Sequence, residues 1–308
     1  MNSTTHSPNV VARLTGQFCA RLRTATSGRR FRPSLWGGAV ALAAHSRADT
    51  TAALKNVCAR VIGLSADTGR VLGDAAVRAA HTLSLLTLKP GLFTADGREH
   101  AGQVWWHGLG LASATAPPQA WLSGRPGWPP RGHGQHKGSF GDVLVLGGAA
   151  GMGGAALLAA RAALACGAGR VFIARLDPAE ALAVDPQRPE LMPRRPESLL
   201  SPAVLGAATV VCGCGGGTAV AECLPAVLAD AARLVLDADA LNAIAGSTAL
   251  QAALLDRASR QRPTLLTPHP LEAARLLGTT TAAIQADRLA QAQALPVFQP
   301  AQLFDRRY

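Results

Sequence analysis

Short apolar runs alternate with helix-like segments between residues 142 and 277, and this alternation limits the fold more than any other feature of the chain. Strands that alternate with helices are typical of an α/β fold, with a mainly parallel sheet covered by helices on both faces. The predicted strands are 142–146, 170–175, 209–212, 233–236 and 263–266. The predicted helical segments are 154–166, 178–184, 219–231, 241–244 and 270–277.

One uncharged apolar run, residues 143–160, is long enough to cross a membrane. Its glycines cluster in the middle, between a Val-rich beginning and an Ala- and Leu-rich end. This order predicts a buried strand, a glycine turn and the start of a helix. We therefore expect no membrane partner.

The 308 residues are enough for about two domains, at roughly 150 residues per domain. Residues 114–135 are rich in Pro, Gly and Trp and are predicted to be a linker. Before it, short strands are predicted at 57–64, 81–88 and 102–107. Residues 1–55 show no consistent helix or strand pattern, and residues 296–308 also stay unassigned.

The positive charge of the chain is concentrated at its beginning. The formal net charge is +11, and residues 1–48 contain seven Arg and no Asp or Glu. A basic arm that binds nucleic acid is one hypothesis. An aromatic content of 4% and the lack of a known motif argue against it, so no nucleic-acid partner is expected.

The six cysteines form no C-x-x-C pair. Cys212 and Cys214 lie in an apolar, glycine-rich run without a neighbouring His. A zinc site or a disulfide framework is therefore not expected, and buried reduced thiols in a cytoplasmic protein are the better interpretation.

Four distinctive segments follow predicted strands, and ligands bind beyond the carboxyl ends of parallel strands. Residues 147–154 (GGAAGMGG) and 213–217 (GCGGG) are glycine loops that allow backbone N–H groups to approach a phosphate. Each loop also fits a simple tight turn. The other two segments, 236–242 and 267–272, carry the candidate polar side chains.

Asp237 and Asp239 are two residues apart at the end of a strand, where carboxylates hold a metal, accept protons or orient a hydroxyl. The structural alternative is that Asp239 caps the next helix. His269 stands between two prolines that stiffen its backbone, which makes it a site candidate. Glu272 falls in the first turn of a helix, where the helix dipole favours it without any catalytic role.

In order and spacing, these segments resemble the dehydratase domain of the NAD(P)H-hydrate repair enzymes, a ribokinase-like family. The likeness covers residues 136–295. The residues that carry it are 136–141 (HKGSFG), 143–148 (VLVLGG), 165–170 (ACGAGR), 188–192 (RPELM), 237–242 (DADALN), 266–270 (LTPHP) and 285–289 (QADRL).

This resemblance implies a function. In the family, phosphate from ADP is transferred to the ring hydroxyl of (S)-NAD(P)H-hydrate and then eliminated, which restores NAD(P)H. The cofactors implied are ADP or ATP with Mg²⁺. Residues 56–113 resemble the end of the Rossmann-like epimerase domain that precedes the dehydratase in bifunctional members.

The resemblance also implies site residues. Gly154, Ala155, Gly217 and His269 would line the hydrated dinucleotide, with Asp237, Asp239 and Asn242 at the same edge of the sheet. The glycines of the second loop would bind the nucleotide, namely Gly213, Gly215 and Gly216. No residue is assigned to a metal.

The chain also departs from the family pattern. Cys214 and Gly216 replace the usual Pro and Leu, and Leu271 replaces Gly. The likeness ends near Leu295, before the family's Lys-Gly segment and its Gly-Asp loop with the general base. We therefore expect a sheet incomplete at its C-terminal side and impaired dehydratase activity.

Epimerase activity is not expected, because Ala59 and Ile62 replace the family's Asp and Ser. Two alternatives stay open, a non-catalytic dinucleotide-binding remnant and a small-molecule kinase of the same fold. An incomplete sheet exposes an edge, so poor solubility or a partner is expected, and a homo-oligomer is compatible with this.

Overall fold

The computed structural model describes residues 31–36, 39–44, 63–85, 87–107, 120–124, 127, 130–181 and 183–295. For residues 31–36, 39–44 and 85 it describes the backbone alone. The chain divides into two compact units, Met1–Arg125 and Pro126–Tyr308. The boundary falls within the segment predicted to be a linker, whereas the assignment of each domain to a family stays a prediction.

Unit 1 contains a four-stranded sheet in the order β1-β2-β3-β4. The β1/β2 and β2/β3 pairs are antiparallel, and β3/β4 is parallel. The elements are β1 Phe31–Trp36, β2 Ala39–Ala44, β3 His81–Leu85, the 3₁₀ helix η1 Pro90–Leu92, α3 Gly97–His100 and β4 Gln103–His107.

The predicted strands 81–88 and 102–107 are present in unit 1 in slightly shorter form, as β3 and β4. Residues 1–55 were left unassigned from the sequence, and in the structure β1 and β2 form an antiparallel pair there. Most of the strand predicted at 57–64 lies outside the described residues, and Leu64 forms an isolated bridge with Val71.

Unit 2 contains a six-stranded sheet in the order β10-β9-β8-β5-β6-β7, and all neighbouring strands are parallel. Five of these six strands match those predicted. The strands are β5 Asp142–Gly147, β6 Arg170–Arg175, β7 Met192–Pro193, β8 Thr209–Cys212, β9 Arg233–Leu236 and β10 Thr264–Leu266, of which only the two-residue β7 was not foreseen.

The helices of unit 2 confirm four of the five predicted segments. The exception is 178–184, where the Ala179 N–H donates to the Asp177 carboxylate at 3.0 Å and the chain forms a turn. The helices are η2 Lys137–Phe140, α4 Gly153–Ala165, η3 Pro196–Ser198, α5 Pro202–Ala207, α6 Val220–Asp230, α7 Ala238–Ala245, α8 Thr248–Ser259, α9 Pro270–Leu277, α10 Thr281–Ala286 and α11 Arg288–Ala294.

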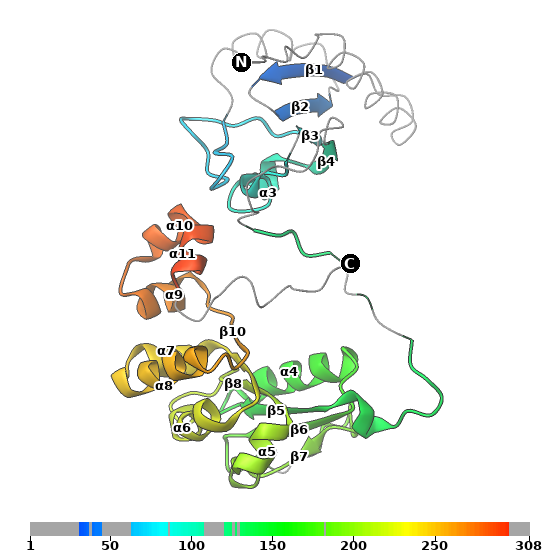
Figure 1. Cartoon of the computed structure of the whole chain (residues 1–308), viewed down its shortest axis with the longest axis vertical. Helices are drawn as coiled ribbons and strands as arrows, with labels where there is room; N and C mark the ends of the chain where they lie inside the picture. Colours follow the sequence, from blue (N-terminus) through cyan, green and yellow to red (C-terminus); the bar gives the residue numbers. More distant parts are fainter. Residues whose placement is uncertain are drawn as a thin grey trace. The chain divides into compact units, whose positions relative to one another are not determined.

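The unit 2 sheet is buried on both faces, as Figure 1 shows with α4 on one face and α5 and α6 on the other. Leu144 and Leu146 of β5 join the larger core, which includes Leu224 of α6 and Leu241 of α7. Val145 points the opposite way and packs in the second core with residues of α4. Alternate residues of a strand face opposite sides, so one strand contributes to both cores.

The apolar run 143–160 forms most of β5, a glycine loop and the first half of α4, as predicted. None of the helices in the described part of the chain combines the length and apolar character that a membrane span requires.

Candidate functional site

The four segments singled out in the sequence follow β5, β8, β9 and β10, which are neighbours in the parallel sheet. Leu146 pairs with Cys212, and Leu236 pairs with both Cys212 and Leu266, so the strands end at the same level. The prediction that these segments gather at one edge of the sheet is confirmed. We call this edge, formed by residues 147–155, 213–217, 237–242 and 267–272, the carboxyl rim.

The two glycine loops of the rim are hydrogen-bonded to each other through their backbones. The Gly148 N–H donates to the Cys214 carbonyl at 3.0 Å, and the Ala149 N–H donates to the Gly215 carbonyl at 2.7 Å. Gly213 has a φ of +114°, and a side chain there would collide with the Asp237 carbonyl oxygen. The close approach of the second glycine loop to the segment after β9 therefore requires glycine at position 213.

Packing also accounts for the two other glycines predicted to bind the nucleotide. A Cβ at Gly215 would lie 2.9 Å from the Ala155 Cβ, and a Cβ at Gly216 would lie 2.7 Å from the Val220 Cβ. The Gly216 N–H donates to the Gly213 carbonyl at 3.0 Å. Contacts within the protein thus explain these glycines, and their nucleotide-binding role stays a prediction.

The N-terminus of α4 is the open part of the rim. Gly154 is exposed, and a Cβ there would meet no atom within 4 Å. The first N–H groups of a helix lack acceptors within it, so they suit an anion. The Glu180 carboxylate, paired with Arg175 at 2.7 Å, already lies beside Gly153. A phosphate would therefore have to approach on the Gly154 side.

Asp239 connects the second glycine loop to α7. The Gly217 N–H donates to its Oδ2 at 2.8 Å, and Gly217 has a φ of +56°, in the left-handed region that favours glycine. The structural alternative, in which Asp239 caps the next helix, is wrong, because Asp237 holds the N-cap position and makes no side-chain cap bond. Asp239 therefore ties two rim segments together.

Asp237 is the centre of a small polar cluster. Its Oδ1 accepts from the Thr267 hydroxyl at 2.6 Å, and its Oδ2 accepts from the Cys214 thiol at 3.5 Å. Burial, followed by the charge of Asp237, raises the pKa of Cys214 to about 11. Between the two carboxylates, Ala238 has a φ of +46°, which is uncommon for a residue with a side chain.

His269 is the N-cap of α9. Its Nδ1 accepts from the N–H groups of Leu271 and Glu272 at 3.1 and 3.3 Å, while the buried Glu272 accepts from the His269 N–H at 2.9 Å. An accepting Nδ1 places the proton on Nε2, which lies 3.1 Å from Glu272 Oε1. Both ring nitrogens therefore have structural partners, and Glu272 stabilises the helix start as expected.

Asn242 lies on α7 and bonds to the neighbouring helix α9. Its Oδ1 accepts from Arg275 Nη1 of α9 at 2.5 Å, so it links two helices. Thr267 and Cys214, which bond to Asp237, and Arg275, which bonds to Asn242, were not among the predicted site residues. The position of Thr267 directly after a strand was the signal that could have identified it.

A model of one protein family matches this chain over residues 143–301, and its description is NAD(P)H-hydrate dehydratase. The match spans just over half of the 308 residues and includes the whole rim. The chain belongs to the NAD(P)H-hydrate dehydratase family.

Curated relatives carry related names. The ADP-dependent (S)-NAD(P)H-hydrate dehydratase of Neisseria meningitidis is 43% identical over 162 residues, covering 52% of this chain and 53% of that protein. The bifunctional NAD(P)H-hydrate repair enzyme Nnr of Coxiella burnetii is 37% identical over 237 residues, covering 73% of this chain and 46% of that protein. The chain spans about half the length of the curated relatives it matches.

Solved structures of similar proteins include an ADP/ATP-dependent NAD(P)H-hydrate dehydratase from Bacillus subtilis, co-crystallised with ATP/Mg²⁺. It is 30% identical, covers 52% of this chain and 56% of its own, and has a TM-score of 0.39. A ribokinase-like protein from Enterococcus faecalis is 23% identical, covers 54% of this chain and 57% of its own, and has a TM-score of 0.41.

The open N-terminus of α4 suits a phosphate. Within the described residues, no three His, Cys, Asp or Glu side chains are grouped to hold a metal. Mg²⁺ is commonly held by substrate phosphates and one or two carboxylates, and Asp237 and Asp239 are the rim carboxylates that could supply them.

Proposed function

We propose that the carboxyl rim catalyses the ADP-dependent dehydration of (S)-NAD(P)H-hydrate to NAD(P)H. The observation that carries the proposal is the joining of both glycine loops, Asp237 and Asp239 at one rim, in a chain of the dehydratase family. The name of the Neisseria relative, at 43% identity, supports the same reaction. ADP, when bound, supplies the phosphate that turns the ring hydroxyl into a leaving group.

The residues of this chain would divide the task. Gly154 and Ala155 would present the N-terminus of α4 to a phosphate of the hydrated dinucleotide. Gly217, held by Asp239, would give the backbone a fixed shape close to the substrate. His269 would contact the substrate through the exposed surface of its ring, because its two nitrogens stabilise α9.

The nucleotide would lie against the second glycine loop, formed by Gly213, Gly215 and Gly216. Asp237 and Asp239 would bind Mg²⁺ together with the nucleotide phosphates, or orient the ring hydroxyl. Asn242 would act indirectly, because its hydrogen bond with Arg275 holds α7 against α9.

The experiment is to incubate the full chain with hydrated NADH, ADP and Mg²⁺ and to follow the recovery of NADH absorbance. Recovery that is lost in Asp239→Asn and retained in the matched surface variant Asp256→Asn would support the proposal. Calorimetric binding of the hydrate without recovery would indicate a non-catalytic dinucleotide-binding module instead. If the chain neither binds nor converts the hydrate, the proposed function fails.

A further inference from the structure

A second concave site lies at the opposite end of the same strands. A pocket of about 420 Å³ is formed where β5, β8 and β9 begin, and its lining includes Phe140, Asp142, Ala163, Cys166, Thr209 and Arg233. Its size falls within the range of small-molecule sites. None of these residues belongs to the carboxyl rim, so the pocket is separate from the proposed function.

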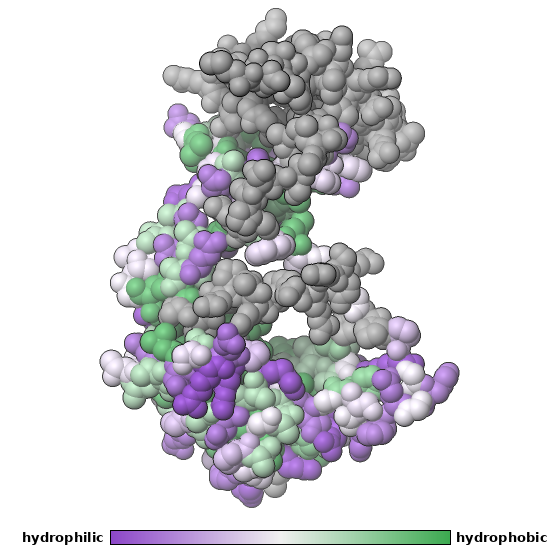
Figure 2. Space-filling model, in the orientation of Figure 1, coloured by the Kyte–Doolittle hydropathy of each residue, from purple (hydrophilic) through white to green (hydrophobic). Residues whose placement is uncertain are grey.

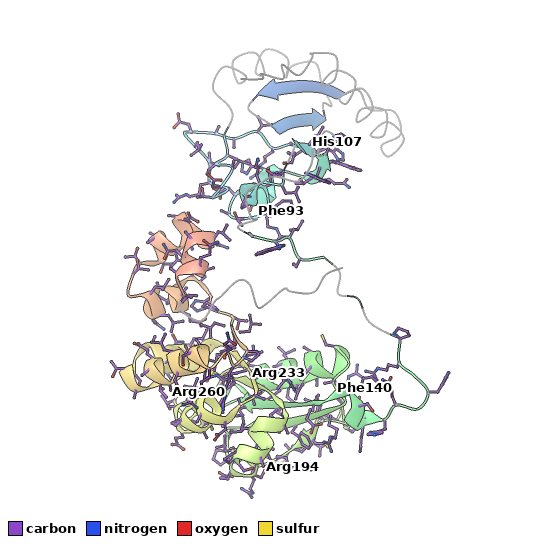
Figure 3. All side chains as sticks on the ribbon, viewed as in Figure 1. Phe93, His107, Phe140, Arg194, Arg233 and Arg260 are labelled. Carbon is purple, nitrogen blue, oxygen red and sulfur yellow. The ribbon has the colours of Figure 1, made fainter. Side chains whose placement is uncertain are left out.

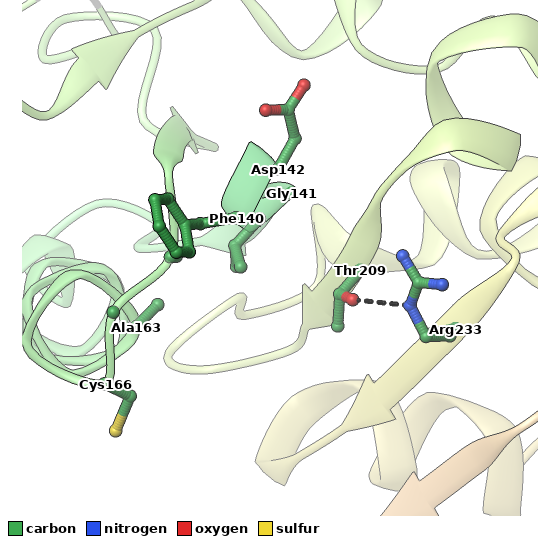
Figure 4. Close-up of a pocket in the computed structure, with 10 residues that line it drawn as sticks. Phe140, Gly141, Asp142, Ala163, Cys166, Thr209 and Arg233 are labelled. Carbon is green, nitrogen blue, oxygen red and sulfur yellow. Dashed lines mark hydrogen bonds between the residues drawn. The ribbon is translucent and has the colours of Figure 1, made fainter. Parts of the chain in front are cut away.

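One side of the pocket is polar. Arg233, the first residue of β9, donates from Nε to the Thr209 hydroxyl at 2.9 Å, and Figure 4 shows the two side chains together. This bond uses the acceptor side of the hydroxyl, so its own hydrogen is available to a ligand. The two Nη groups of the exposed Arg233 have the planar spacing that matches a carboxylate.

The other side of the pocket is apolar. In Figure 4, Phe140 and Ala163 lie across the pocket from Thr209 and Arg233. The Arg131 guanidinium lies 4.1 Å from the centre of the Phe140 ring, and its Nη2 donates to the Gly167 carbonyl at 2.9 Å. These contacts hold the aromatic wall in place.

The charge balance favours an anion. Asp142 is the acidic side chain in the pocket lining, and both of its oxygens accept from Arg170, at 2.7 and 2.6 Å. Its charge is therefore neutralised within the protein. Arg233 has no carboxylate partner among the ion pairs of the described residues, which leaves a net positive charge on the polar side.

We propose that this pocket binds a small carboxylate with an apolar body. The carboxylate accepts from the Nη groups of Arg233 and from the Thr209 hydroxyl, while the apolar body packs against Phe140 and Ala163. Two strands connect this pocket with the rim. β8 runs from Thr209 at the pocket to Cys212, just before the rim, and β9 runs from Arg233 at the pocket to Leu236, just before the rim.

The test is a ligand-observed NMR titration of the full chain with benzoate. Benzoate is expected to bind, whereas acetate lacks the apolar body and benzyl alcohol lacks the charge, and both should bind at least about tenfold more weakly. Arg233→Gln and Thr209→Val should weaken benzoate binding, the first by about tenfold or more.

The matched control is Arg260→Gln. Arg260 is an exposed residue just after α8, where hydrophilic residues gather on the surface (Figures 2 and 3), and it pairs with Asp256. This variant removes the same charge at a residue that does not line the pocket, and it should leave benzoate binding unchanged. Equal loss in both Arg variants would indicate general attraction to a basic protein, and it would overturn the proposal.

A second measurement needs no variant. Cys166 is exposed and lines the pocket, so bound benzoate should slow its alkylation by iodoacetamide, measured on the Cys166 peptide by mass spectrometry. An unchanged rate at saturating benzoate would contradict the proposal. So would an absence of benzoate binding to the wild-type chain.

Discussion

At the scale of single residues, Asp239 makes the clearest connection between segments of the rim. Its carboxylate accepts the Gly217 N–H at 2.8 Å and is half-buried. Asp239→Ala should lower the free energy of unfolding by about 1 to 2 kcal/mol, since a hydrogen bond to a charged group is lost. Urea unfolding followed by circular dichroism measures this change.

The matched variant is Asp256→Ala, which removes an exposed carboxylate paired with Arg260. Its effect should stay below about 0.5 kcal/mol, because exposed ion pairs contribute little. Equal losses in the two variants would show that the bond between Asp239 and Gly217 does not stabilise the rim.

The reactivity of the Cys214 thiol depends on the charge of Asp237. Burial and the Asp237 charge raise its pKa to about 11, so its alkylation should accelerate only as the pH approaches that value. Asp237→Asn removes the negative charge and should lower the pH at which Cys214 reacts at half its maximal rate. Iodoacetamide labelling read on the Cys214 peptide checks this, with exposed Cys166 in the same digest as the internal control. If Asp237→Asn does not change the midpoint pH of Cys214 labelling, burial alone raises the pKa of Cys214.

Much of the rim could be predicted from residue types and spacing, because each candidate directly follows a strand. The hydrogen-bond partners of these candidate side chains could not be predicted. Asp239 looked like a cap by its position before an apolar helix, but the backbone of Gly217, 22 residues earlier, competes for the carboxylate. His269 looked like a functional side chain, yet its ring completes a capping box. The bond of Asp239 joins distant segments, which sequence spacing does not reveal, whereas the bonds of His269 are local, to Leu271 and Glu272.

At the scale of elements, Arg257 fastens α8 to the end of α6. It is buried, and it donates from Nη1 to the Leu228 and Ala231 carbonyls at 2.9 and 2.8 Å and from Nε to the Thr264 hydroxyl at 3.0 Å. Burial, followed by the charge of Arg262, lowers its pKa to about 10, so it stays charged at neutral pH. A cation at the carbonyl end of a helix is favourable.

Arg257→Ala should therefore lower the free energy of unfolding by about 3 kcal/mol, because it leaves a cavity and unpaired carbonyl groups. Arg257→Met should lose less, since it keeps most of the volume and removes a buried charge whose Nη2 has no hydrogen-bond partner among the described residues. Arg260→Ala is the exposed control and should change stability by under about 0.5 kcal/mol. Chemical unfolding of the three variants measures these values, and equal losses for Ala and Met would exclude the cavity contribution.

Three of the helices that the sequence pattern missed share a feature. Each of α8, α10 and α11 begins with a capping side chain: Ser247, Thr280 and Asp287 accept from the backbone N–H three residues later. Those caps are readable in the sequence. The segment at 178–184 was predicted as helical by composition, and the side chain of Asp177 formed a turn instead.

At the scale of the whole molecule, the order of the strands determines which loops form the carboxyl rim and which strand is left at the edge of the sheet. Parallel strands with crossover helices bring loops that are distant in the chain to one rim, so the sequence predicts the gathering of these loops once the strands are recognised. The same order makes β10 an edge, because among the described strands it pairs with β9 alone. The exposed edge expected from the sequence is therefore present in the described residues.

An unpaired edge strand favours association between chains. Leu265, in the middle of β10, is 37% exposed. Leu265→Lys should reduce self-association of the full chain, because a charge at the edge opposes strand pairing, and it should change stability by less than about 1 kcal/mol. Leu158→Lys adds the same charge at a position on α4 that is 68% exposed and away from the edge, so it should leave association unchanged. Sedimentation velocity over a range of concentrations distinguishes these outcomes. A wild-type chain that stays monomeric throughout, or an equal effect of both variants, would show that the β10 edge does not drive association.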